Sequence, residues 1–247
     1  MTDADLAAHL AEAAGKLLLA VRGADVFSAK ALGKAGDATA NEFLCHAIRE
    51  QRPEDGLLSE ETKCDGSRLA QERVWIVDPV DGTREYGEGR PDWAVHVGLS
   101  INGVASIGAV ALPGLDTVLR TDQPFAVPAP GNPLRMVVSR TRPAAEAVMV
   151  AEKLGAELVP MGSAGAKALA IVRGEADIYL HSGGQYEWDS CAPAAVALAF
   201  GLHTSRIDGS PLVYNREDVY MPDLLICRHE HAELVLAILR EGAGAAG

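Results

Sequence analysis

The first half of the chain carries apolar residues at helical spacing and then at strand spacing. Leu6, Leu10, Ala13 and Leu17 recur every three or four positions, which predicts an amphipathic helix. Residues 39–42 read Thr-Ala-Asn-Glu, the form of a capping box, so the sequence predicts that a second helix begins there. Helices therefore precede the strands in this half.

Segments with strand character follow. Residues 56–58 and 75–77 are short apolar runs, and residues 94–101 alternate between larger apolar and smaller or polar side chains. Asn102 and Gly103 then mark a tight hairpin that leads into residues 104–112. We expect an antiparallel sheet with helices packed on it.

Four prolines and a glycine interrupt residues 123–133, and we place a subdomain boundary in this segment. Beyond it, short apolar strands alternate with helical segments, which is an α/β pattern. The expected strands are residues 136–138, 157–159 and 178–180, and the expected helices are residues 144–154, 166–172, 192–200 and 231–239. The chain thus divides into an α+β subdomain at residues 1–125 and an α/β subdomain at residues 134–247.

Composition and charge narrow the class of protein. The 247 residues, 48% of them hydrophobic and 23% charged, are typical of a globular protein with a sizeable core. A formal net charge of −12 argues against a nucleic-acid polymer or an anionic membrane as the partner. No apolar run approaches the roughly 20 residues of a membrane span. The acidic start of the chain and four cysteines without paired spacing favour free thiols and a cytoplasmic location.

The most informative polar residues are two aspartates at the end of an apolar run. Asp78 and Asp81 flank Pro79 and precede Gly82, so we expect the strand to stop at Pro79 and a turn to follow. Two carboxylates crowded in this way repel each other unless protons or cations lie between them. Clustered oxygen ligands favour Mg²⁺ over zinc as the cation.

Three segments carry a family resemblance. Residues 78–83, Asp-Pro-Val-Asp-Gly-Thr, resemble the D-P-[IVL]-D-G-T signature of the inositol monophosphatase-like family of Mg²⁺-dependent phosphatases. Residues 58–61 (Leu-Ser-Glu-Glu) and 187–193 (Glu-Trp-Asp-Ser-Cys-Ala-Pro) are similar to two further family segments, in the family's order. The resemblance implies a layered α-β-α-β-α sandwich in which both halves build one site. It also implies two Mg²⁺ ions, with a third left open.

The same resemblance assigns ligands to the metal ions. These would be the side chains of Glu60, Asp78, Asp81 and Asp189 and the carbonyl group of Val80. Asp189 also stands where a helix is expected to begin, and it could serve only as a helix cap.

The reaction and the substrate would involve a second, overlapping set of residues. Glu60 and Thr83 would activate the attacking water together with Asp81, and the amides of Gly82 and Thr83 would hold the phosphate. The remaining substrate contacts would come from Arg84, Ser163, Lys167 and Asp189. Arg84 could instead pair with a neighbouring acid, and Lys167 could be a solvated helix lysine.

The residues after the signature indicate a branch of the family. Residues 81–86 (Asp-Gly-Thr-Arg-Glu-Tyr) and 162–167 (Gly-Ser-Ala-Gly-Ala-Lys) are similar to segments of the bisphosphate nucleotidases. The implied activity is removal of the 3′-phosphate of 3′-phosphoadenosine 5′-phosphate (PAP), or of the related PAPS, in sulfate assimilation. Inhibition by Li⁺ and a homodimer are also expected from the resemblance. Inositol 1-phosphate and fructose 1,6-bisphosphate are alternative substrates, and a non-catalytic regulator that binds a phosphorylated metabolite is a further alternative.

One position departs from the family pattern. Asn41 aligns with a family aspartate that contributes to a third, weaker metal site. A neutral amide is a poorer Mg²⁺ ligand than a carboxylate. The sequence therefore leaves the third site in doubt unless Asp37 substitutes for the missing carboxylate.

Overall fold

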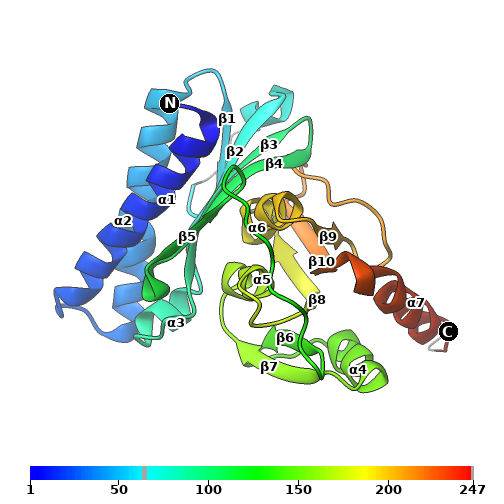
Figure 1. Cartoon of the computed structure of the whole chain (residues 1–247). Coiled ribbons are helices and arrows are strands. Elements are labelled where there is room, and N and C mark those ends of the chain that lie inside the picture. Colours follow the sequence, from blue (N-terminus) through cyan, green and yellow to red (C-terminus); the bar gives the residue numbers. More distant parts are fainter. Residues whose placement is uncertain (63–65, 246–247) are drawn as a thin grey trace.

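Two five-stranded sheets organise the protein, and helices cover both faces of each sheet (Figure 1). The structure is a computed structural model that describes residues 1–62 and 66–245. Cys64 lies outside the described residues. The predicted α-β-α-β-α layering is confirmed.

The first sheet has the strand order β1-β2-β3-β4-β5. β1 runs parallel to β2, and the remaining pairs are antiparallel. Asn102 and Gly103 both have positive φ, as the predicted hairpin between β3 and β4 requires. The strands are β1 (Gly56–Ser59), β2 (Arg73–Asp81), β3 (Ala94–Ile101), β4 (Val104–Leu112) and β5 (Thr117–Arg120).

The second sheet has the order β7-β6-β8-β10-β9. β6 pairs in parallel with β7 and β8, whereas β10 pairs antiparallel with β8 and β9. The strands are β6 (Arg135–Ser139), β7 (Glu157–Met161), β8 (Ile178–Tyr186), β9 (Leu202–Ser205) and β10 (Tyr220–Arg228).

Apolar faces of the helices fill the layers between and outside the sheets. α1 (Asp3–Gly23) and α2 (Ala29–Gln51) cover the outer face of the first sheet, where Trp75, Leu44 and Leu18 are fully buried. α5 (Ala164–Val172) and α6 (Glu187–Ala199) lie between the two sheets, and α4 (Ala145–Leu154) and α7 (His229–Ala245) cover the outer face of the second. The short elements are α3 (Thr83–Gly87), η1 (Ser67–Ala70) and η2 (Pro113–Leu115).

The structure corrects three local predictions. The second helix begins at Ala29 and not at the expected capping box, because Thr39 lies mid-helix and donates its hydroxyl to the carbonyl of Ala35. β2 does not stop at Pro79 but continues to Asp81, with a shift in its register against β3 between Asp78 and Asp81. Sequence patterns also missed β5, β9 and β10, of which β10 is an interior strand of its sheet.

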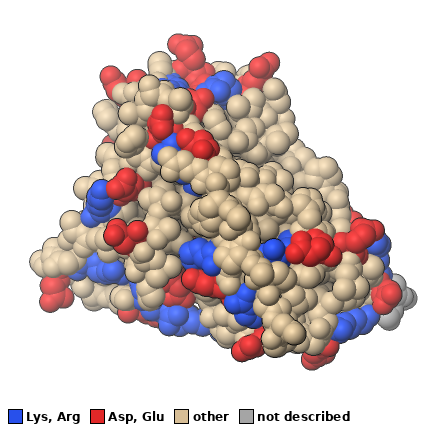
Figure 2. Space-filling view, viewed as in Figure 1, with Lys and Arg blue, Asp and Glu red and all other residues tan. Residues whose placement is uncertain are grey.

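Surface charge and the described cysteines agree with a globular protein. Acidic and basic side chains are interspersed over the face shown in Figure 2. Cys45, Cys191 and Cys227 are buried free thiols. Within residues 1–62 and 66–245, none of the helices is long and apolar enough to cross a bilayer.

α6 joins the two halves because glycines in the first sheet let its backbone approach closely. A Cβ atom at Gly98 would lie 2.9 Å from the amide nitrogen of Ala192, and one at Gly108 would lie 2.5 Å from its carbonyl oxygen. Since the first turn of α6 carries Asp189, this close packing sets the distance between that carboxylate and β2.

We therefore expect Gly108→Ala to destabilise the protein by about 1–3 kcal/mol, because the added methyl group must push α6 away from β4. Urea unfolding measures the change. Gly23→Ala is the matched control, since a Cβ atom there meets nothing within 4 Å. Equal stability of the two variants would show that α6 does not depend on this contact.

Candidate metal centre

Three aspartates from two elements converge between the sheets. Asp78 and Asp81 come from the irregular end of β2, and Asp189 comes from the first turn of α6. One carboxylate oxygen from each lies within 4.8 Å of the other two. Asp78 and Asp81 are buried and Asp189 is half-buried. Residues from both halves of the chain thus form one acidic cluster.

Local backbone geometry explains why Asp78 and Asp81 face the same point. Pro79 has no N–H to donate, and the amide of Val80 turns to donate to Asp78 Oδ1 over 3.0 Å. Gly82 then adopts φ +89°, a left-handed conformation in which a Cβ atom would lie 3.2 Å from that of Ser163. The Pro-Val-Asp-Gly segment therefore bends the chain so that both carboxylates point inward.

Asp81 is held by the beginning of α5. Its Oδ1 accepts from the amide of Ala164 over 3.0 Å, and its Oδ2 accepts from the amide of Gly165 over 2.6 Å and from the hydroxyl of Ser163. Ser163 has φ +48° and also caps α5 by accepting from the amide of Ala166. These donors stabilise the ionised carboxylate.

His96, which sequence reasoning passed over, is the imidazole that faces Asp81. It lies opposite Asp78 on β3, is fully buried, and its Nε2 is 3.1 Å from Asp81 Oδ2. Its Nδ1 lies 3.0 Å from the carbonyl of Trp188, to which it donates. Gly165 makes room for this ring, because a Cβ atom there would come within 2.0 Å of Nε2. An ionisable residue in an otherwise apolar strand was the only sequence signal.

The electrostatics of the two β2 aspartates are opposite. Burial by itself would raise the pKa of Asp81, but the charge and hydrogen bond of His96, with Lys167 and Ser163, hold that pKa below its ordinary value. Burial would likewise lower the pKa of His96, yet the charge of Asp81 outweighs it and raises that pKa. Asp78 has no such partner, so burial and the charges of Asp81 and Glu60 raise its pKa well above the ordinary value.

The other acids of the region also hold protons unusually tightly. Burial and the charge of Asp81 raise the pKa of Asp189 to about 6. Glu60 follows β1 and is exposed as a whole residue, but partial burial of its carboxyl group and the charge of Asp189 raise its pKa to about 7. Glu60 is therefore near the cluster, although it is not one of the three residues whose oxygens lie within 4.8 Å.

This donor set fits a hard divalent cation. Carboxylate oxygens are the ligands that Mg²⁺ and Ca²⁺ take, and a cation would relieve the repulsion that raises the pKa values of Asp78, Asp189 and Glu60. Asp81 Oδ2 already accepts from Ser163 and Gly165 and faces His96. Its Oδ1 accepts only one hydrogen bond and is the atom with room for a cation.

Thr83 and Asp37 form a polar pair beside the cluster. The Thr83 hydroxyl is 3.3 Å from Asp37 Oδ2 and 3.2 Å from the carbonyl of Val80, so its partner is Asp37 and not Glu60. Gly33, one turn earlier on α2, allows this approach because a Cβ atom there would lie 2.7 Å from the Thr83 methyl group. Burial and the charge of Glu61 raise the pKa of Asp37 to about 7.

Asn41 anchors the loop that follows β1. Its amide oxygen accepts from the hydroxyl of Ser59 over 2.6 Å and from the thiol of Cys45 over 3.3 Å, and its amide nitrogen donates to Thr62 over 3.1 Å. Asn41 is thus engaged in holding the residues on either side of Glu60. Asp37, not Asn41, is the residue of α2 that faces the cluster.

Two of the candidate substrate residues have protein partners. Arg84 donates to Glu88 over 2.8 Å, the exposed pairing that the sequence left open. Lys167 is buried, not solvated, and its ammonium group donates to the carbonyls of Ser163 and Gly162 at 2.5 and 3.3 Å. Lys167 therefore stabilises the start of α5, the same turn whose amides donate to Asp81.

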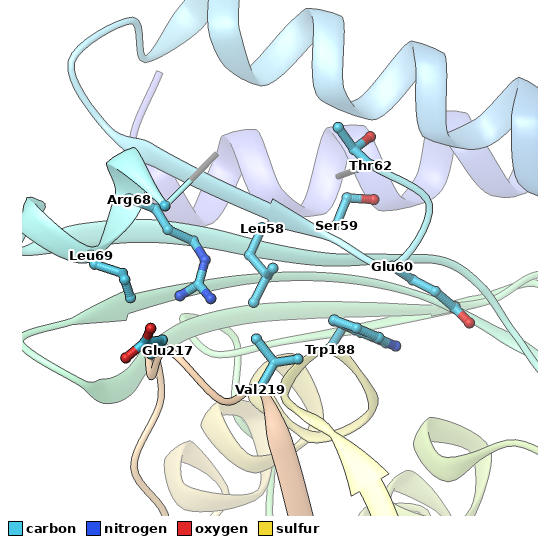
Figure 3. Close-up of a pocket in the computed structure, with 10 residues that line it drawn as sticks. Leu58, Ser59, Glu60, Thr62, Arg68, Leu69, Trp188, Glu217 and Val219 are labelled. Atoms are coloured by element: carbon cyan, nitrogen blue, oxygen red, sulfur yellow. The ribbon is translucent and has the colours of Figure 1, made fainter. Parts of the chain in front are cut away.

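A cavity of about 450 Å³ is lined by Glu60 and by Trp188, the residue that precedes Asp189 in α6 (Figure 3). Glu60 and Trp188 lie at one end, Arg68 and Glu217 lie at the other, and Leu58 and Val219 lie between them. The guanidinium of Arg68 is fixed by the side chain of Asn215 and the carbonyl of Arg216. The cavity is therefore bounded by both halves of the chain.

The opposite environments of the two β2 aspartates predict opposite effects of the same substitution. Asp78→Asn keeps the acceptor for the Val80 amide and removes a repelled charge, so the metal-free variant should melt at or above the wild-type temperature. Asp81→Asn leaves donors at the start of α5 unpaired and should lose about 1–3 kcal/mol. Both variants should lose stabilisation by added Mg²⁺ in thermal melts. Similar destabilisation by the two changes would contradict this account.

The raised pKa values also predict how stability depends on pH. The folded protein holds protons on Asp37, Glu60 and Asp189 up to about pH 6–7, whereas the unfolded chain releases them near pH 4. Without metal, these groups therefore make the free energy of unfolding fall as the pH rises from about 4 to about 7. Added Mg²⁺ should restore more stability at the higher pH, because it favours the ionised carboxylates. Urea unfolding with EDTA or Mg²⁺ tests this, and a Mg²⁺ effect that is larger at the lower pH would refute it.

Comparison with known proteins identifies the family. Residues 4–243 match the model of the inositol monophosphatase family. A relative from Mycobacterium leprae (strain TN), named 3′-phosphoadenosine 5′-phosphate phosphatase, is 50% identical over 256 residues, with 98% of this chain and 94% of the relative covered. The 3′(2′),5′-bisphosphate nucleotidase CysQ of Escherichia coli (strain K12) is 26% identical over 200 residues, with 76% and 81% covered.

Solved structures share the fold. Staphylococcal IMPase-II superposes with a TM-score of 0.82 at 20% identity, with 99% of this chain and 96% of that chain covered. CysQ from Bacteroides thetaiotaomicron gives a TM-score of 0.78 at 23% identity, with 89% and 94% covered. The sequence match over nearly the whole chain and the shared fold lead to one conclusion: this protein belongs to the inositol monophosphatase family.

Proposed function

We propose that this protein is a phosphoric monoester hydrolase that removes the 3′-phosphate of PAP to give AMP, with Mg²⁺ as its cofactor. Two observations support the proposal: a chain-wide relative at 50% identity is named a PAP phosphatase, and Asp78, Asp81 and Asp189 from two of the family motifs lie close together. The convergence of the three aspartates, and the presence of the Asp37–Thr83 pair beside them, argue against a regulator that only binds phosphorylated metabolites.

Different residues of the site would bind the cations and orient the attacking water. Two divalent cations, when bound, neutralise the phosphate and stabilise the charge that develops on the leaving oxygen. Asp78, Asp81, Asp189, Glu60 and the carbonyl of Val80 are the proposed ligands. Asp37 accepts a hydrogen bond from the Thr83 hydroxyl, so the lone pairs of the Thr83 oxygen are free to accept a hydrogen bond from the attacking water and orient it. The site thus needs no covalent intermediate with the protein.

Other parts of the proposal rest on the family resemblance alone. A role for the amides of Gly82 and Thr83 in holding the phosphate stays a prediction, as do Li⁺ sensitivity, a homodimer and a place in sulfate assimilation. A cytoplasmic location also stays a prediction, and it rests on the acidic start of the chain and the spacing of the cysteines. Subdomains at residues 1–125 and 134–247, which would meet at the cluster, are likewise a proposal. Because Asn41 is engaged by Ser59, Thr62 and Cys45, a third cation would depend on Asp37 instead.

A substrate panel tests the proposed activity. We expect kcat/KM for PAP to exceed the values for inositol 1-phosphate and fructose 1,6-bisphosphate, with release of phosphate abolished by EDTA and restored by Mg²⁺. Colorimetric phosphate assays measure all three. If PAP ranks last, or if EDTA has no effect, the proposal fails.

Thr83→Val provides the mechanistic check on that panel. Loss of the hydroxyl should lower kcat for PAP by roughly 100-fold or more while KM changes little, because the lost hydrogen bond orients only the attacking water. Thr39→Val is the matched control, since Thr39 bonds only within α2. A wild-type kcat in Thr83→Val would show that the Asp37–Thr83 pair does not serve the reaction.

A further inference from the structure

Three aromatic side chains gather beside Asp189. Tyr186 and Trp188 stack with ring centroids 4.9 Å apart and planes 14° from parallel, and Tyr220 meets Tyr186 edge-on at 6.1 Å and 77°. The whole chain has only three tryptophans and five tyrosines. Their concentration at one point is therefore notable, and we call Tyr186, Trp188 and Tyr220 the aromatic platform.

The platform is exposed although it is built from large rings. Tyr186 and Tyr220 remain 46% and 42% exposed even with these ring contacts. Their backbones are paired directly across the ends of β8 and β10, so both side chains project from the same face of the sheet. Exposed apolar surface rimmed by polar groups commonly marks a binding site. The two tyrosine planes form a corner with open aromatic surface.

The platform is also rigidly attached to the acidic cluster. The amide of Tyr186 donates to Asp189 Oδ2 over 2.6 Å, so a proposed metal ligand fixes the backbone of the platform. The buried carboxylate of Glu187 accepts from the amides of Asn215 and Arg216, both over 2.8 Å, and so ties the segment that leads into Tyr220. Hydrogen bonds therefore fix the backbone of Tyr186 relative to the acidic cluster and tie the start of α6 to the segment before Tyr220.

Glycines next to the platform are needed for its shape. Gly183 and Gly184 have φ of +94° and +98°, which other residues rarely adopt. A Cβ atom at Gly184 would lie 2.5 Å from the hydroxyl oxygen of Tyr220, so a side chain there would displace that ring. The absence of a side chain at Gly184 thus lets the Tyr220 ring take its position beside the end of β8.

We propose that the aromatic platform binds the purine base of the substrate. This inference rests on the proposed function, in which the substrate is a nucleoside bisphosphate. A base is a planar, largely uncharged ring system that stacks on tyrosine, and one ribose separates it from the 3′-phosphate. Stacking also suits a chain with a net charge of −12, because it needs no basic residues. Inositol phosphates and fructose bisphosphate have no aromatic ring, so the platform selects for nucleotides.

Binding measurements test the platform without requiring turnover. Isothermal titration calorimetry in Mg²⁺ compares AMP with ribose 5-phosphate, which lacks the base. We expect the wild type to bind AMP more tightly, and Tyr186→Leu and Tyr220→Leu to weaken AMP binding by roughly 5- to 100-fold without changing ribose 5-phosphate binding. Tyr186→Phe and Tyr220→Phe should restore AMP affinity, because phenylalanine keeps the ring.

Phe125→Leu is the matched control. Phe125 is 50% exposed and makes an edge-on contact with Phe200 at 4.8 Å, but it lies in the segment that joins the two sheets. It should bind AMP as the wild type does, and circular dichroism establishes that all variants are folded. If the Tyr186→Leu and Tyr220→Leu variants lose affinity equally for AMP and ribose 5-phosphate, or lose none for either, the platform does not bind the base.

Kinetics separate this inference from the proposed function. In the leucine variants KM for PAP should rise while kcat is retained, and the kinetics with fructose 1,6-bisphosphate should match those of the wild type. If wild-type protein does not hydrolyse PAP, the proposed function fails, and the AMP comparison still decides whether the platform binds a base. If wild-type protein hydrolyses PAP and the leucine variants keep its KM, the inference that the platform binds the base is wrong, and the proposed function stands.

Discussion

Buried negative charge is the constraint on which the rest of this structure depends. Asp78, Asp81 and Asp189 bring carboxylate oxygens within 4.8 Å of one another between two sheets. Such groups cannot all be ionised in a weakly solvated site without a compensating charge. The protein compensates only one of them fully. Asp81 has His96 and the donors at the start of α5, whereas Asp78 and Asp189 retain raised pKa values. That imbalance is what a bound cation would correct.

The fold holds the acids together through close backbone packing. Gly98 and Gly108 let α6 lie directly on the first sheet, Gly165 admits the ring of His96, and Gly33 admits the methyl group of Thr83. Each of these glycines lies where two elements meet, and a Cβ atom there would come within 3 Å of the neighbouring element. The site therefore depends on several backbone approaches that leave little room for larger residues, which is typical of an interior packed to high density.

In the proposed function, the release of phosphate and the choice of substrate use different parts of the same region. The proposed roles of the acidic cluster and of the Asp37–Thr83 pair concern only the phosphoryl group and the water, so they are the same for any phosphate monoester. The aromatic platform, in contrast, offers a surface only to a planar ring. Asp189 belongs to both, since its carboxylate joins the cluster and accepts from the amide of Tyr186. Selectivity can thus change through the aromatic side chains while the acids stay in place.

Local sequence patterns were enough to predict most helices and strands, because periodicity and turn residues act over a few neighbouring residues. The layered fold and the ligand roles of the acids came from the family resemblance of three short motifs. Local patterns failed where pairing partners lie far apart in the chain. β5, β9 and β10 gain their strand conformation from neighbours in the sheet. Residues 39–42 have the form of a capping box, but they lie inside α2, which begins at Ala29. The sequence by itself determined which positions of the chain hold the carboxylates of the acidic cluster. Only the tertiary structure decided that Asp37 partners Thr83 and that His96 faces Asp81. It also decided that Lys167 is buried and that Tyr186 and Tyr220 share a surface. Each of these depends on contacts between elements that are far apart in the chain, which no local pattern encodes.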